Sequence, residues 1–151
     1  MTPFNSCYSM ELCPAFWKWI DDANERGIAF SIHKVKLELV AFGDGLSHWA
    51  KDRDEDFFLK FDEGCLEKFE KVTAFVNGSQ YFSQANKADF YSKADCYLIA
   101  HALAHGFTVV TFEKAAGYNT SKVKIPAICS GLGVPCMNLW ELLRVQKVKL
   151  S

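Results

Sequence analysis

Residues 94–113 have the sequence ADCYLIAHALAHGFTVVTFE, and this stretch decides the fold class. Its first part, Ala94–His105, predicts a strong helix that Gly106 ends. The following Phe107–Phe112 predicts an apolar strand that is buried on both faces, because its β-branched residues show no polar alternation. A helix that leads directly into such a strand is typical of a parallel sheet covered by helices on both sides.

The same alternation of helices and strands extends outward along the chain. The sequence predicts helices at Pro14–Glu25, Lys34–Phe42, Leu46–Asp52, Cys65–Val76, Pro126–Leu132 and Leu139–Val145, strands at Ile28–Ile32 and Val134–Met137, and a poorly patterned connection through Tyr91. This pattern predicts a doubly wound α/β domain with a mostly parallel sheet. Such sheets bind their ligands at the carboxyl ends of the strands.

The composition indicates one compact domain over residues 1–151. Half of the chain (50%) is hydrophobic and 15% is aromatic, which suffices for a single core. The 17 basic and 18 acidic residues give a net charge of −1, so nucleic acid could bind only at a local patch. The 6 cysteines form no close pair, and neither a signal-peptide pattern nor a membrane-length apolar run is present. We therefore expect a reduced, cytoplasmic protein that does not enter a membrane.

Three carboxylates are candidate site residues. Asp95 and Glu38 fall on the apolar faces of their predicted helices, where packing alone would place hydrophobic residues. Glu113 directly follows the Phe107–Phe112 strand, at the carboxyl edge of the sheet. A carboxylate cluster repels itself unless a cation neutralises it, and oxygen ligands suit Mg²⁺ or Mn²⁺. The alternative is three separate structural roles, with Asp95 as a helix cap, Glu38 as a rim residue and Glu113 as a loop acid.

Two lysines lie beside the same predicted edge. Lys122 and Lys124 alternate with apolar residues in the only basic stretch of the chain. They could hold phosphates while the acids hold metal. An ordinary solvated strand fits this pattern equally well.

The remaining features that could bind a metal favour structural roles. His101 and His105 are spaced i, i+4, which could hold zinc on one helical face. The metalloprotease motif requires Glu after the first His, where this chain has Ala102, so we favour a structural or surface role. The cysteines are expected to be buried small hydrophobes. The acid-rich stretch Lys51–Lys71 predicts a solvated face or loop without chemistry.

Several stretches together carry a resemblance to a known family. They are CPAFWKWI at 13–20, SIHKVKLEL at 31–39, ADCYLIAHA at 94–102, TVVTFE at 108–113 and KIPAICSGLGVPC at 124–136. This combination resembles the PIN-domain ribonucleases typified by VapC-type toxins, and more closely the subfamily known as DUF4411. The resemblance implies a three-layer α/β/α fold with a central, mostly parallel sheet. It also implies that Glu38, Asp95 and Glu113 are catalytic residues that bind Mg²⁺ or Mn²⁺.

The activity that this resemblance implies is metal-dependent endonucleolytic cleavage of RNA. A metal-activated water would attack the phosphodiester. Members of the family often act as toxins that a neighbouring antitoxin protein holds inactive, and they are frequently homodimers. We therefore expect RNA as substrate, with an antitoxin and a second copy of the chain as partners.

The start of the chain departs from the family pattern. The family begins with a strand carrying L-D-x-N, whose Asp is a further metal ligand, whereas this chain begins with MTPFN. Counting back from Tyr8–Cys13, that Asp would precede Met1. We therefore expect a domain shortened at its N-terminus, with its first strand absent or replaced by Met1–Cys7. The alternative function is a catalytically inert PIN-like protein that binds a protein partner or RNA.

Overall fold

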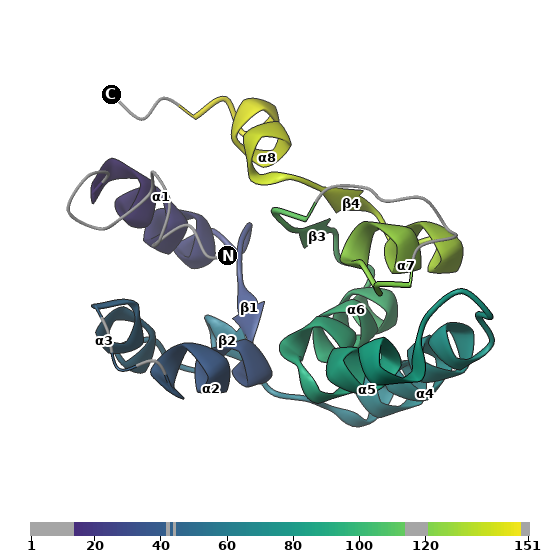
Figure 1. The fold of residues 1–151 in the computed structure, drawn as a ribbon. Helices are drawn as coiled ribbons and strands as arrows, with labels where there is room; N and C mark the ends of the chain where they lie inside the picture. Colours follow the sequence, from purple (N-terminus) through teal and green to yellow (C-terminus); the bar gives the residue numbers. More distant parts are fainter. Residues whose placement is uncertain (1–13, 42, 44, 114–120, 149–151) are drawn as a thin grey trace. The chain divides into compact units, whose positions relative to one another are not determined.

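The computed structural model describes residues 14–41, 43, 45–113 and 121–148. The contacts within the chain define two compact units, one formed by Met1–Lys60 with Val145–Ser151 and the other by Phe61–Arg144. Each unit combines helices with a short pair of parallel strands, so the chain is a helix-rich α/β protein (Figure 1). No helix in the described ranges has both the length and the apolar character needed to cross a bilayer.

The N-terminal unit pairs its two short strands in parallel. In chain order its elements are α1 (Pro14–Glu25), β1 (Ser31–Ile32), α2 (His33–Ala41), α3 (Gly45–Lys51) and β2 (Phe58–Leu59). Ser31 lies opposite Phe58, and Ile32 lies opposite Leu59. Helix α2 begins at the residue directly after β1, so the strand ends there.

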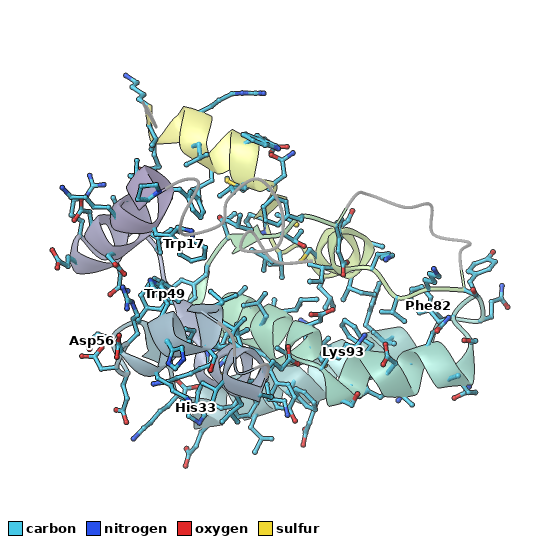
Figure 2. All side chains as sticks on the ribbon, turned by 60° about the vertical axis from the view of Figure 1, so that its left-hand side comes forward. Trp17, His33, Trp49, Asp56, Phe82 and Lys93 are labelled. Atoms are coloured by element: carbon cyan, nitrogen blue, oxygen red, sulfur yellow. The ribbon has the colours of Figure 1, made fainter. Side chains whose placement is uncertain are left out.

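Aromatic rings form much of the core of this unit. Trp49 of α3 lies edge-on to Trp17 of α1, with ring centroids 5.0 Å apart (Figure 2), and edge-on to Phe57 at 5.1 Å. The guanidinium of Arg53 lies 4.4 Å from the centroid of the Trp49 ring and donates two hydrogen bonds to the carboxylate of Asp21. Stacking and ion pairing therefore fix α1 against α3.

The C-terminal unit is mainly helical. Its elements are α4 (Glu63–Asn77), α5 (Gln84–Ser92), α6 (Ala94–His105), β3 (Val109–Val110), α7 (Ile125–Leu132), β4 (Cys136–Met137) and α8 (Leu139–Val145). Helices α4 and α6 lie side by side (Figure 1), and their facing side chains, including the fully buried Val72 and Ile99, form the centre of the core. Gly106 and Gly133 end α6 and α7 at φ values of +73°, a conformation that glycine adopts without strain.

The second strand pair is short because of the residues that flank β4. Val109 pairs with Cys136 in a parallel register. Pro135 precedes β4 and has no N–H to donate. Asn138 follows β4 and directly precedes α8, and its side-chain oxygen accepts a hydrogen bond of 2.8 Å from the N–H of Glu141 in the first turn of that helix. The ladder therefore extends no further in either direction.

These strands correct part of the sequence-based prediction. The strand predicted over Phe107–Phe112 contains ladder pairing only at Val109–Val110. The prediction that it is buried on both faces is wrong, since Val110 is 37% exposed and Phe112 is 40% exposed. The described residues form two separate two-stranded sheets, one in each unit, and not the single central sheet of a three-layer fold. The early start of α2 and the residues beside β4 explain why each pair is so short.

Other expectations from the sequence fare better. The α/β class is confirmed, and α1 and α8 have the predicted bounds. The connection through Tyr91 instead contains α5, which Ser83 begins by accepting a hydrogen bond of 3.1 Å from the N–H of Asn86. Met1–Cys7 lies outside the described residues, so the absence of a first strand stays a prediction, as does a single domain over residues 1–151.

Candidate functional site

The structure distributes the three predicted acids over both units. Glu38 is exposed on α2, a helix without a buried residue in its described part, and belongs to the N-terminal unit. Asp95 lies half-buried in the first turn of α6, and Glu113 lies half-buried after β3, both in the C-terminal unit. The convergence of all three acids on one metal ion stays a prediction.

The carboxylate of Glu113 has a structural partner. Its Oε2 accepts a hydrogen bond of 2.7 Å from the N–H of Ile125, the first residue of α7. Lys124, at the N-cap position, makes no side-chain capping bond. Glu113 therefore satisfies one of the amides that a helix leaves unpaired at its start, and its negative charge lies at the positive end of the helix.

The two predicted phosphate-binding lysines immediately precede α7. Lys122 is exposed and Lys124 is half-buried. Their segment is attached to α5 through Ser121, whose carbonyl oxygen accepts hydrogen bonds from the Asn86 side chain at 2.8 Å and the Ser83 amide at 3.3 Å. Contact of either lysine with phosphate stays a prediction.

A different group of side chains comes together between the start of α4 and the end of α6. The Sγ atom of Cys65 lies 3.2 Å from Nδ1 of His101 and 3.7 Å from Nε2 of His105. One ligand atom from each side chain lies within 4.8 Å of the other two. Within the described part of the C-terminal unit, no other group of three or more Cys, His, Asp or Glu side chains is compact enough to hold a metal ion.

Asp62 connects this cluster to the backbone of α4. Its Oδ1 accepts a hydrogen bond of 2.8 Å from the N–H of Cys65, which makes Asp62 the N-cap of the helix. Its Oδ2 lies 2.8 Å from Nε2 of His105. One carboxylate therefore ties the beginning of α4 to the last residue of α6.

Burial sets the protonation of the cluster. Cys65 is completely buried, and burial raises the pKa of its thiol to about 11. Burial also lowers the pKa of His101, which is 3% exposed, and the nearby charge of Asp62 only partly opposes this effect. Hydrogen bonds from the thiol and then the amide of Cys65, with a smaller contribution from His105, lower the pKa of Asp62 to about 2. At neutral pH the metal-free cluster thus contains a thiol, a neutral His101 ring and an ionised Asp62.

Aromatic rings surround the two imidazoles. Phe61 lies edge-on to His101 with centroids 5.6 Å apart, and Phe107 stacks on His105 at 5.6 Å. Phe61 also contacts Tyr97 edge-on at 5.5 Å. These contacts restrict the orientation of both imidazoles, which is what a binding site requires of its ligands.

Comparison with known proteins identifies the family of the chain. Residues 1–150 match the family described as "Domain of unknown function (DUF4411)". The chain belongs to this family. No curated protein and no solved structure matches it. The DUF4411 match carries no activity with it.

The sequence pattern of this DUF4411 chain points to only two members of the cluster, His101 and His105, and favours a structural or surface role for both. It predicts no chemistry in the acid-rich Lys51–Lys71 stretch that contains Asp62 and Cys65. The available signal was Asp-x-x-Cys followed much later by His-x-x-x-His. The side chain of an N-cap residue accepts a hydrogen bond from the amide three positions later in the chain, so Asp62 and Cys65 are neighbours in space. This spacing resembles the paired ligands of zinc sites.

Proposed function

We propose that this DUF4411 protein is a PIN-like endoribonuclease that hydrolyses RNA phosphodiesters with Mg²⁺ or Mn²⁺, acting in the cytoplasm as the toxin of a toxin–antitoxin pair. The observation that carries the proposal is the placement of two acids around one helix and strand. Asp95 lies in the first turn of α6, and Glu113 follows β3, the next element in the chain. A helix and a strand joined by a short turn run in opposite directions, so both acids belong to the end opposite that turn.

The donor chemistry of the acids fits a hard divalent cation. Carboxylate oxygens are the preferred ligands of Mg²⁺ and Mn²⁺. Oε2 of Glu113 is engaged by Ile125, so Oε1 would be its ligand atom. Glu38 would complete the set of metal ligands in this proposal. Antitoxin binding and homodimer formation are further parts of the proposal.

In this mechanism the residues of the chain hold and orient the reacting groups. A bound metal would supply a water of lowered pKa and would neutralise charge on the phosphate. Glu38, Asp95 and Glu113 would fix its position. Lys122 and Lys124 would bind the RNA backbone, since lysine is a common phosphate ligand that reads no base sequence.

A second candidate function is supported by the Glu113–Ile125 hydrogen bond. That bond gives the acid a structural role that needs no metal. An inert PIN-like protein would use the same fold to bind a protein partner or RNA without cleaving it.

Incubation of the purified protein with end-labelled RNA and Mn²⁺ tests the proposal. We expect cleavage that a chelator abolishes and that Asp95→Asn lowers by at least about 100-fold, because a metal ligand is removed. Asp89→Asn is the matched control: Asp89 is an exposed acid on α5 that pairs with Lys93 at 2.8 Å, and its loss should leave cleavage unchanged.

Circular dichroism of each variant checks that the fold is retained. Cleavage that survives Asp95→Asn contradicts the proposed site. Folded wild-type protein that binds the labelled RNA without cutting it in Mn²⁺ supports the inert alternative instead.

A further inference from the structure

The distances within the cluster between α4 and α6 approach those of a coordinated metal. In a tetrahedral zinc site, bonds of about 2.3 Å to sulfur and about 2.05 Å to nitrogen place the two ligand atoms about 3.6 Å apart. The separations from Sγ of Cys65 to Nδ1 of His101 and Nε2 of His105 are 3.2 and 3.7 Å. The sulfur thus already lies at nearly the coordination spacing from one nitrogen of each imidazole, and the three ligand atoms lie within 4.8 Å of one another.

Asp62 lies beside the cluster, next to His105. Its Oδ1 is anchored by the amide of Cys65, and its Oδ2 is directed at Nε2 of His105, 2.8 Å away. Once Nε2 binds a metal, it has no proton to donate to Asp62. The free oxygen of the carboxylate would then be available as a fourth metal ligand, while the anchored oxygen keeps its capping bond.

We infer that Cys65, His101, His105 and Asp62 form a tetrahedral binding site for a divalent transition metal, with zinc as the expected ion. The donor set selects the metal, because one sulfur and two imidazole nitrogens suit zinc, whereas Mg²⁺ and Ca²⁺ prefer oxygen ligands. None of these residues belongs to the proposed nuclease site, so the inference does not rest on the proposed function.

The site is structural in character. Its four protein ligands leave no open position for substrate, and Cys65 and His101 are buried. Cys65 and His101 are 36 positions apart in the sequence, so the ion cross-links the start of one core helix to the end of another. On binding, the Cys65 thiol releases its proton to solvent and its sulfur forms the metal bond, so no electron is transferred.

Elemental analysis of the protein, purified without a metal-binding tag from zinc-supplemented medium, is the first test. We expect one zinc ion per chain. His105→Gln should lose most of this zinc, and the fold should survive because the side chain of His105 is 39% exposed. His33→Gln removes an exposed histidine on α2 and should retain the full zinc content.

Cobalt substitution is the second test, and it reports the ligands directly. Chelator-treated protein given Co²⁺ should show the intense visible bands of a tetrahedral ion and a near-ultraviolet band from thiolate-to-cobalt charge transfer. Cys65→Ser should lose the charge-transfer band, whereas Cys136→Ser, which alters a half-buried cysteine outside the cluster, should keep it. If Cys65→Ser does not fold, His105→Gln alone decides through the loss of the visible bands.

Two results overturn the inference. One is wild-type protein that is folded, contains no zinc and shows no tetrahedral cobalt spectrum. The other is a His105→Gln variant that binds as much zinc or cobalt as the wild type does. Either result reduces the cluster to a hydrogen-bonded thiol–imidazole group.

Discussion

Glu113→Ala separates the structural role of this acid from its proposed catalytic role. The substitution removes the carboxylate that accepts the 2.7 Å hydrogen bond from Ile125 at the start of α7, where Lys124 makes no side-chain capping bond. Loss of a helix cap costs about 1 kcal/mol, and loss of a negative charge at the helix start costs about 0.3–1 kcal/mol more. We therefore expect the free energy of unfolding to fall by about 1.5 kcal/mol and Tm to fall by about 3–6 °C.

Glu113→Gln keeps an acceptor oxygen but removes the charge. It should lower the free energy of unfolding by only about 0.5 kcal/mol, which is the part that the charge contributes through its interaction with the helix dipole. Urea denaturation followed by circular dichroism measures both variants. Glu67→Ala, at a position on α4 whose side chain is 78% exposed, is the neutral control. If Glu113→Ala unfolds at the same urea concentration as the wild type, the hydrogen bond to Ile125 does not stabilise the fold.

Three further predictions test other parts of the structure. Gly133→Ala should lower the free energy of unfolding by about 1 kcal/mol in urea titrations, because alanine is strained at a φ of +73°. The new methyl group meets no other atom, so no clash adds to this cost, and an unchanged urea midpoint would refute the prediction. Cys96 and Cys129 should resist iodoacetamide at pH 8 in the folded protein and react in urea, because burial raises the pKa of each thiol to about 12; mass spectrometry that finds both alkylated under native conditions would contradict it. Arg53→Lys should lower the free energy of unfolding by about 1 kcal/mol, since lysine cannot make the paired bonds to Asp21, and wild-type stability in thermal unfolding would count against that reasoning.

The sequence predicts the helices well because their ends carry local signals. Pro14 begins α1, and Gly106 and Gly133 follow α6 and α7 in the left-handed conformation that the chain needs there. Each of these signals acts within one helical turn, so its effect does not depend on how the rest of the chain packs. The order of α6, β3 and then Glu113 can be predicted from the sequence for the same reason.

Strand length and the Cys–His cluster depend on partners that sequence patterns do not reveal. The apolar Phe107–Phe112 run could have paired along its whole length, but Pro135 and Asn138 limit its partner strand. The cluster requires α4 to pack against α6 in one particular register. Only that packing brings Cys65 to a pair of histidines far along the chain, which by themselves favour a surface or structural role.

We infer that α4 and α6 bring one sulfur and two imidazole nitrogens to a single metal ion. X-ray absorption spectroscopy at the zinc edge of the purified protein tests it most directly. We expect one sulfur at about 2.3 Å and three nitrogen or oxygen ligands at about 2.0–2.2 Å. A zinc environment without sulfur, or one built from oxygen and water alone, would contradict it.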